Sequence, residues 1–511
     1  MEKANIDLIM ICAGSQGPSD KNHVPLGLLY IGTQLDKLGY KVKIWHILPN
    51  EFNTTIQKIK DRQPLWIGLS VLTGVTTYYA AQLSRMIKTL IPDSPIVWGG
   101  HHPSAVPNEC IKEKYIDFVI VGEGEETAVE FSNALLSGTG YSNILGLGYK
   151  DTHDNSKVNP DRPLVKDLDK FELNWELINI YDYKRNNFHG KTPINFYSSR
   201  GCPYNCTFCS TPLYTGKSFR SHSPQYVARN LGYLNEKYGF NSVFFSDDNF
   251  MIHNDRGFDI ITMLAKQNIT VDTVDVRINQ INESMVSKFK EYGVSGIFFG
   301  YESGNDRILS MIKKDITVEQ TKEKVHLIKK YGIPVWASGI IGLPTETKKE
   351  IYTTIDFALW LKDNLPDLST AVAFRYMPLP ATKLMNLAIQ EGFKYPVSTE
   401  DWRKIDPKEP FYKMSEWIKW MSPSDEKYFA FVQEVSINRM TDYIHNRHFF
   451  VNLLNNLFVS MTRKKVTKRK SNSAVLYKCF DFTRKIYGKL FFGKHVVKTT
   501  GAMKKHSPPS E

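Results

Sequence analysis

The sequence predicts an α/β protein: a doubly wound parallel sheet, then a partial barrel of six β/α units and a mainly helical C-terminal region. Two observations carry this prediction. Short apolar runs of strand length alternate with helical patterns, and the alternation stops and resumes once along the 511 residues. Apolar runs of this length, bounded by turn signals, are typical of buried parallel strands. The composition, 42% hydrophobic and 23% charged, is that of a globular chain with a sizeable core.

Residues 1–150 form the first predicted domain. Helical patterns separate its strands, and each pattern ends near glycine or proline, as helices commonly do. Five such units predict a doubly wound, Rossmann-like sheet. The expected strands are 6–13, 41–47, 65–72, 95–100 and 118–124. Residues 151–190 are polar and rich in turn signals, and we expect them to form a linker.

Residues 191–385 are predicted to form the partial barrel. Six units are too few for a closed eight-fold barrel, and active sites in such folds lie at the C-terminal ends of the strands. The expected strands are 194–200, 242–250, 271–279, 296–303, 334–342 and 370–378. A helical C-terminal domain, 386–460, and a basic tail, 461–511, complete the predicted organisation.

The positive charge of the chain is concentrated in the tail. Residues 461–511 hold 14 Lys or Arg and 2 Asp or Glu, whereas the first 460 residues hold 51 of each kind. The basic pI therefore describes the tail, and the neutral body gives no support for a nucleic-acid partner. Six cysteines in a chain of this length do not form a disulfide framework, so we expect a cytoplasmic protein.

The segment SSRGCPYNCTFCST places Cys202, Cys206 and Cys209 just after the first barrel strand. A four-iron cluster with full protein ligation needs four thiolates. Three thiolates in one loop leave one iron open for another ligand, as a catalytic zinc site keeps one position open. The alternative is a structural zinc site with His222 as the fourth ligand.

The pattern C-x3-C-x-aromatic-C, with Phe208 as the aromatic residue, resembles that of the radical SAM enzymes. The resemblance covers most of 194–380. It implies a 4Fe-4S cluster whose open iron binds S-adenosyl-L-methionine (SAM), with the backbone of Phe208 beside the adenine. It also implies an external electron donor of the flavodoxin or ferredoxin type, and cleavage of SAM to a 5′-deoxyadenosyl radical.

Further segments resemble SAM-binding segments of that family. In FFSDDNF, Asp247 and Asp248 are the candidates for the SAM amino group, because a carboxylate accepts hydrogen bonds from an ammonium. The segment GYESG places Glu302 near the ribose or methionine part of SAM. The segment SGIIGLPTET places Gly339 and Gly342 against the adenine, where glycine permits close approach of the backbone.

The first domain lacks the dinucleotide fingerprint G-x-G-x-x-G after its first strand, which weakens a nucleotide-binding interpretation. Its loops instead resemble the cobalamin-binding domains of B12-dependent radical SAM enzymes. The residues that this resemblance implies for cobalamin binding are Leu26, Gly27, Ser70, Thr73, Gly99, Gly100, His101, Gly122, Glu123 and Gly124.

The motif D-x-H-x-x-G, whose histidine binds cobalt in cobalamin domains of the methionine-synthase type, is absent. The nearest residues, Asp20, His23 and Gly27, have the wrong spacing. We therefore expect cobalamin to bind without a protein histidine on cobalt. His101 and His102 are the alternatives to that expectation.

The two halves together predict a B12-dependent radical SAM methyltransferase. It would methylate an unactivated carbon, or a phosphinate centre, of a small molecule. Arg375 and Tyr376, at the end of the sixth barrel strand, would face the substrate, and the alternative for them is a buried structural role. The alternative with the same cofactors is a cyclase or rearrangement enzyme. A nucleic-acid-binding protein is less favoured, because only the tail supports it.

The tail also raises the question of membrane contact. The run 448–470 has six apolar residues that a helix would gather largely on one side, followed by a polybasic stretch. Such a segment can lie on an anionic membrane surface. This interpretation places the enzyme at the inner face of the membrane and favours a lipid-soluble substrate. The alternative is a helix packed on the barrel with a solvated extension.

Overall fold

The computed structural model describes residues 4–12, 23–187, 190–366, 369–406, 414–423 and 425–426. The chain divides into two compact units, Met1–Trp420 and Met421–Glu511. The basic tail, and residues 427–460 of the predicted helical domain, lie outside the described residues. The elements that follow all belong to the first unit.

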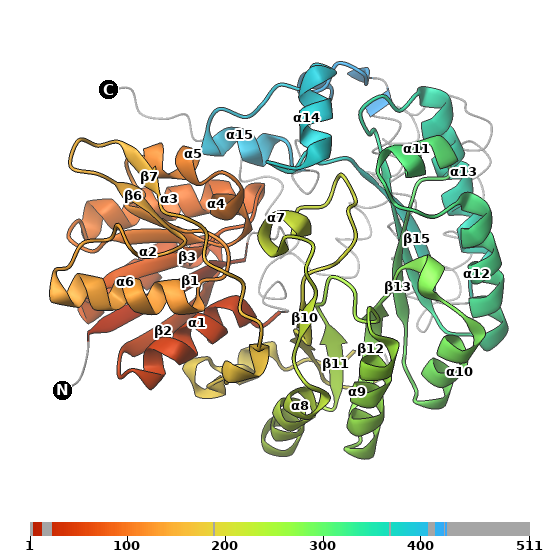
Figure 1. Cartoon of the computed structure of the whole chain (residues 1–511), viewed down its shortest axis with the longest axis horizontal. Coiled ribbons are helices and arrows are strands. Elements are labelled where there is room, and N and C mark those ends of the chain that lie inside the picture. The colour runs from red at the N-terminus through yellow and green to blue at the C-terminus, as the bar shows by residue number, and fades with distance from the viewer. Residues whose placement is uncertain are drawn as a thin grey trace, which may run out of the picture. The chain divides into compact units, whose positions relative to one another are not determined.

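The N-terminal domain is built on one seven-stranded sheet with the order β2-β1-β3-β4-β5-β6-β7 (Figure 1). The first five strands are parallel, as the sequence predicts, and β6 and β7 extend the sheet in antiparallel pairing. The strands are β1 Asn5–Ile11, β2 Lys41–Ile47, β3 Trp66–Ser70, β4 Ile96–Gly99, β5 Phe118–Ile120, β6 Leu147–Lys150 and β7 Ser156–Val158.

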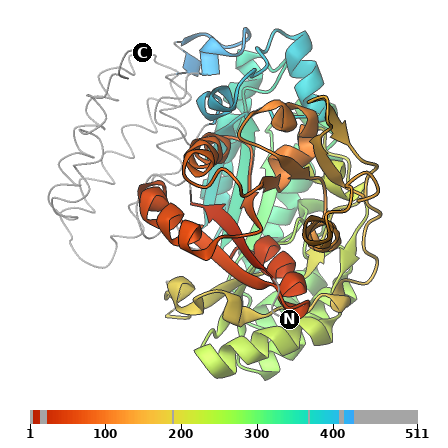
Figure 2. The ribbon, with the colours of Figure 1, turned by 90° about the vertical axis from the view of Figure 1, so that its left-hand side faces the viewer.

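Helices cover this sheet, and Figure 2 turns the N-terminal domain, red to orange, towards the viewer. Helix α1 packs with α6, and α2 packs with α3. The helices are α1 Leu26–Lys37, α2 Phe52–Arg62, α3 Val75–Leu90, α4 His101–Ala105, α5 Pro107–Lys112 and α6 Glu125–Ser137, with a 3-10 turn η2 Pro49–Glu51. The doubly wound prediction is confirmed.

Residues 151–190, expected as a linker, contain ordered structure. Strand β7 pairs with β6, and three 3-10 turns follow, η3 Leu168–Lys170, η4 Trp175–Leu177 and η5 Ile180–Tyr183. Leu168 and Phe171 are buried against Tyr30 of α1. Turn residues hid these contacts from sequence analysis, because isolated apolar side chains between turns produce no periodicity.

The second sheet has six parallel strands in the order β15-β14-β13-β12-β11-β8, so consecutive strands are neighbours and the sheet is open between β15 and β8. This is the predicted partial barrel. Its strands are β8 Pro193–Phe196, β11 Ser242–Phe245, β12 Thr270–Asp275, β13 Ile297–Glu302, β14 Val335–Ile341 and β15 Thr370–Arg375. A short ribbon, β9 Ser199–Arg200 with β10 Arg220–Ser221, flanks the cysteine loop.

Helices of the barrel domain alternate with its strands and shield one face of the sheet (Figure 1). Side-chain caps begin several of them; the Thr317 and Thr347 hydroxyls accept hydrogen bonds from backbone N–H groups of α12 and α13. The helices are α7 Thr211–Thr215, α8 Pro224–Tyr238, α9 Asn254–Lys266, α10 Glu283–Glu291, α11 Asp306–Met311, α12 Val318–Tyr331, α13 Lys348–Asn364, α14 Lys383–Gln390 and α15 Thr399–Lys404, with 3-10 turns η6 Ile278–Gln280 and η7 Met414–Glu416. Among the described residues, no helix is both long and apolar enough to cross a bilayer.

Candidate functional site

The cysteine loop lies between β9 and α7, at the C-terminal end of the first barrel strand. Backbone hydrogen bonds hold its middle on two sides: the Thr207 N–H donates to Ile312 O (2.9 Å), and Thr207 O accepts from the Leu384 N–H (2.9 Å). The loop is thereby tied to the ends of α11 and α14. Its three thiols therefore sit on a backbone that is fixed by distant parts of the barrel.

All three cysteines of the loop are free and half-buried. Burial raises the pKa of Cys202 to about 11 and raises that of Cys209, so a metal would have to displace the protons when it binds. Within the described residues no three His, Cys, Asp or Glu side chains converge on a single ion. A cluster whose thiolates bind different irons does not need such convergence. Three unpaired thiols on one anchored loop fit an iron–sulfur cluster.

The carboxylates of the two aspartates after β11 have different surroundings. Asp247 is 3% exposed, and its carboxylate accepts four hydrogen bonds, from the backbone N–H groups and hydroxyls of Ser198 and Ser199 (2.5–3.2 Å). Asp248 is exposed and faces the cysteine loop; it accepts from the Gly201 N–H (3.2 Å) and the Thr211 hydroxyl (2.7 Å). Asp247 thus holds the start of the loop, and Asp248 is the carboxylate open to a ligand.

A third aspartate joins this pair, and sequence analysis missed it. Asp275 is the last residue of β12 and is half-buried. Burial, and then the negative charges of Asp247 and Asp248, raise the pKa of Asp275 to about 8. The signal was present in the sequence as a carboxylate at a strand end, in VDVRIN.

Glu302 ends β13 in a left-handed conformation (φ 57°), which non-glycine residues adopt at a cost in strain. Its carboxylate is buried and accepts a hydrogen bond from Lys314 Nζ (2.7 Å). The Glu302 carboxylate fills the space beside Gly300, where a Cβ would lie 2.0 Å from its Oε1. The predicted SAM residue therefore lies at the expected strand end, paired to a lysine.

The two predicted adenine-contacting glycines differ in their surroundings. A Cβ on Gly339 would lie 2.4 Å from the Tyr301 ring, so this glycine makes room for a tyrosine of the neighbouring strand. Gly342 has φ 79°, and its N–H donates to Glu346 Oε2 (2.7 Å), as does that of Leu343 (3.0 Å). Burial raises the pKa of Glu346 to about 8, and the two backbone donors oppose that shift. Only Gly342 has the backbone conformation that demands glycine.

The predicted cobalamin residues gather at the C-terminal edge of the first sheet. Ser70 of β3 pairs in register with Gly99 of β4, and the Gly122 N–H after β5 donates to Ser104 Oγ (3.0 Å). Gly100 has φ 97°, and a Cβ there would lie 3.1 Å from Val71 O. The edge is therefore lined by small residues, which leaves the backbone accessible to a long cofactor tail.

Four other residues of the cobalamin set have different surroundings. Leu26 is buried at the start of α1, and Gly27 is exposed beside it. A Cβ on Gly124 would meet the Ile31 side chain at 2.8 Å, which makes this glycine a packing residue between α1 and α6. Thr73 Oγ1 lies 3.2 Å from His102 Nδ1.

The three histidines considered as cobalt ligands differ in burial and in the side chains that they contact. His102 is buried, with its ring edge-on to Trp402, and burial lowers its pKa to about 3. His23 is exposed, and its ring lies 5.9 Å from that of Phe244 in β11. His101 is exposed and stacks on Tyr214 of α7 (4.9 Å between ring centroids), and the Tyr214 hydroxyl donates to His101 O (2.9 Å).

Glu123, which is also expected at the cobalamin, joins the first domain to the barrel. Its carboxylate accepts from Arg200 Nη1 (3.1 Å) and from Arg220 Nη2 (2.9 Å) of the β9–β10 ribbon, and Glu125 accepts from Arg200 Nη2 (2.6 Å). Burial would raise the pKa of Glu123, but the hydrogen bonds and charges of the two arginines lower it below its usual value. The Glu123 carboxylate is therefore an ion-pair partner, and a contact between this residue and cobalamin stays a prediction.

His222 is not placed as a zinc ligand. It is 1% exposed; its Nδ1 lies 2.9 Å from Asp169 Oδ1, and its Nε2 lies 2.9 Å from the Tyr30 hydroxyl. Burial lowers the pKa of His222 to about 4, against the hydrogen bond and charge of Asp169. Both ring nitrogens thus have protein partners, which argues against the alternative of a structural zinc site.

The inner face of the barrel sheet is apolar and partly exposed. Tyr301 packs against Phe357 of α13, so the side chains that alternate with it point away from the helices. Phe298 and Phe374 belong to this inner set and are 38% and 42% exposed, opposite Trp336 and Ile340 of β14 respectively. Of the expected substrate residues, Arg375 is the last residue of β15 and is half-buried, and Tyr376 follows it and is buried at 2% exposure.

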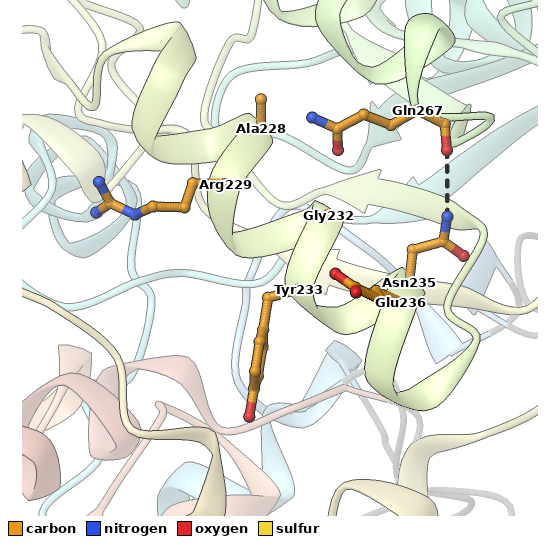
Figure 3. A pocket seen from close by; sticks show the side chains of 7 residues that line it. All are labelled: Ala228, Arg229, Gly232, Tyr233, Asn235, Glu236 and Gln267. Carbon is orange, nitrogen blue, oxygen red and sulfur yellow. Dashed lines mark hydrogen bonds between the residues drawn. The ribbon is translucent and has the colours of Figure 1, made fainter.

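A separate cleft of about 500 Å³ lies on the outside of the barrel (Figure 3). The second half of α8 lines it, and the Asn235 amide donates to Gln267 O (3.2 Å) across one end. Because α8 runs antiparallel to the strands, this end of the helix lies by the N-terminal strand ends. Conserved chemistry in β/α barrels lies at the opposite ends, and we assign no role to this cleft.

Comparison with known proteins agrees with this geometry. Residues 18–132 match the B12 binding domain, and residues 196–358 match the Radical SAM superfamily. An uncharacterized methyltransferase of Pyrococcus horikoshii is 33% identical over 408 residues, covering 78% of this chain and 84% of the relative. The cytidylyl-2-hydroxyethylphosphonate methyltransferase of Streptomyces wedmorensis is 24% identical, covering 76% of this chain and 80% of that protein.

The fold is also that of a solved structure. The radical S-adenosylmethionine methyltransferase TsrM from Kitasatospora setae superposes with a TM-score of 0.63 at 18% identity, over 77% of this chain and 78% of TsrM. The cofactors of this architecture are a 4Fe-4S cluster, SAM and cobalamin, and the loops described above fit them. The chain belongs to the B12-dependent radical SAM enzymes of the methyltransferase type.

Proposed function

We propose that this enzyme transfers a methyl group to an unactivated carbon, or to a phosphinate centre, of a small molecule. The contact between His101 and Tyr214 supports the proposal best. His101 lies in the glycine-lined edge of the first domain, and Tyr214 follows Cys209 by five residues, so the expected cobalamin edge adjoins the cluster loop. When bound, the cluster and SAM supply a carbon radical, and cobalamin supplies the methyl group.

We assign the SAM-binding roles by surroundings. Asp248 is the acceptor for the SAM ammonium, because it faces the cysteine loop and retains exposure, whereas the Asp247 carboxylate is enclosed by Ser198 and Ser199. Gly342 presents its backbone to the adenine, and Phe208 does so from the cysteine loop. Glu302 acts together with Lys314 at the methionine or ribose end of SAM.

We assign the cobalamin-binding roles to the edge of the first sheet. The backbone of Gly99, Gly100 and Gly122, with the Ser70 hydroxyl, borders the cofactor tail. No histidine binds cobalt: His102 is enclosed by Thr73 and Trp402, and the His101 ring lies flat on Tyr214. Electron paramagnetic resonance of the Co(II) form tests this, since an axial histidine would add nitrogen hyperfine splitting.

The substrate proposed is a molecule with an apolar skeleton. Phe298 and Phe374 keep about two-fifths of their area exposed on the inner sheet face. Phe374 lies one residue before the C-terminal end of β15, the end at which the cofactors bind, and Phe298 lies near the start of β13. Burying apolar area against such residues contributes about 25 cal/mol per Å². This supports a lipid-soluble substrate, which the enzyme would take from the membrane on which its tail rests. That tail lies outside the described residues.

Product analysis separates methylation from cyclisation or rearrangement. Protein reconstituted with iron, sulfide and cobalamin would be incubated with methyl-labelled SAM, a flavodoxin or ferredoxin reductant and a lipid extract. We expect an extractable product that carries the label and is one methylene heavier. An unlabelled product of another mass would favour the cyclase. A Cys202→Ala control should form neither 5′-deoxyadenosine nor labelled product if the cluster drives the reaction.

A further inference from the structure

Arg277 is a buried cation to which the proposed function assigns no role. It follows β12 by two residues and is 6% exposed. Within the described part of the chain, no carboxylate lies within ion-pairing distance of its guanidinium, and its Nε has no hydrogen-bond partner. An unpaired charge in a protein interior is costly, so the surroundings of Arg277 indicate an anion that binds beside it.

The guanidinium is aimed at the cluster loop. Its Nη1 donates to Cys206 Sγ (3.4 Å), and its plane covers the Tyr204 ring, with the guanidinium carbon 3.7 Å from the ring centroid. Both contacts are to residues of the C-x3-C-x2-C segment. Of the three cysteines in the loop, the guanidinium therefore contacts Cys206.

The far side of the guanidinium is held by a strained turn. Its Nη2 donates to Lys314 O, and the residues on either side of Lys314 are left-handed, Lys313 at φ 53° and Asp315 at φ 53°. The Lys314 side chain is itself locked to Glu302 (2.7 Å). Arg277 thus spans from a fixed turn to the thiol of Cys206, a geometry that its rigid planar fork suits and a lysine cannot reproduce.

We propose that Arg277 is a positioning residue that holds the Cys206 thiolate and stabilises the reduced cluster. A thiolate-ligated cluster gains negative charge on reduction, and hydrogen bonds to its sulfurs set its reduction potential. A guanidinium bonded to one ligand sulfur favours the more negative, reduced form. The inference rests on the assignment of the cluster to this loop, and it concerns the electron that must arrive before SAM is cleaved.

The test compares Arg277→Met and Arg277→Lys with wild type in an EPR-monitored redox titration of the reconstituted protein. We expect the potential to shift negative by about 59 mV or more in Arg277→Met, the equivalent of a tenfold change in a one-electron equilibrium. Arg277→Lys keeps the charge without the fork and should shift less. Formation of 5′-deoxyadenosine at a fixed donor potential should fall at least tenfold in Arg277→Met.

Arg229→Met is the matched control, because Arg229 is 61% exposed on α8 and lines the outer cleft (Figure 3). It should leave the potential unchanged. If Arg277→Met assembles a full cluster at the wild-type potential, the inference is wrong while the proposed function stands. If wild-type protein assembles no cluster, the proposed function fails first. If Arg277→Met does not yield folded protein, the two single variants Arg277→Lys and Tyr204→Leu are titrated instead. Wild-type cluster potentials in both of these variants would overturn the proposal.

Discussion

Replacing Arg200 with methionine should loosen the junction between the cobalamin-binding domain and the barrel. Arg200 lies in β9, and its side chain is 16% exposed. It bonds Glu123 in the β5–α6 loop (3.1 Å) and Glu125, the first residue of α6 (2.6 Å). Methionine keeps most of the volume and removes the charge. Glu123 retains Arg220, whereas Glu125, 5% exposed, is left as a buried anion without its cation.

The size of the effect follows from that burial. Removing one partner of a buried ion pair costs about 3–5 kcal/mol, because the remaining charge stays desolvated. The exposed pair Arg85–Glu400, at 3.0 Å with side chains 47% and 44% exposed, is the matched comparison. Exposed pairs contribute about 0–1 kcal/mol. Arg200→Met should therefore destabilise several times more than Arg85→Met does.

Urea unfolding under anaerobic conditions measures the difference. With a slope of about 3 kcal/mol per molar urea, Arg200→Met should lower the midpoint by about 1 M. The double variant Arg200→Met with Glu125→Gln should recover part of the loss, because no buried anion remains. Equal midpoints for Arg200→Met and Arg85→Met, or a double variant less stable than Arg200→Met, would refute the reasoning.

Three further outcomes are expected. Changing Cys202, Cys206 and Cys209 together to alanine should abolish both the bound iron and 5′-deoxyadenosine formation; four irons retained in the triple variant would refute the cluster assignment. Burial raises the pKa of Glu346 to about 8, so the folded protein favours the protonated carboxyl. The stability that this protonation contributes is complete below the pKa of the unfolded state and is lost as pH rises through about 8. Glu346→Gln, which keeps the acceptor for the two backbone N–H groups, should unfold at a higher urea concentration than wild type at pH 9 and at a similar one at pH 4; equal midpoints at pH 9 would contradict this. Full-length protein should float with anionic liposomes at low salt and a truncation at Ser460 should sink, and equal flotation of the two would remove the support for a membrane-resident substrate.

The sequence by itself determined the two sheets and the cluster loop. Buried parallel strands are continuous apolar runs, and helices between them have their own period, so the parallel strands of both sheets could be predicted from local patterns, whereas the antiparallel strands β6 and β7 were not. The three cysteines of 202–209 lie within one short loop, and their spacing is a local property. The glycines after β4 and β5 were likewise predictable, because tight turns at strand ends restrict residue type.

Only the tertiary structure decided what surrounds these residues. Asp247 and Asp248 are adjacent in the chain, yet one is enclosed by serines of another strand end and the other faces the cysteine loop. Glu123 meets Arg200 and Arg220, which are 77 and 97 residues away along the chain. Ion pairs and hydrogen bonds between distant segments leave no periodicity in the sequence. For the same reason Arg277 became significant only when folding placed its guanidinium against Cys206.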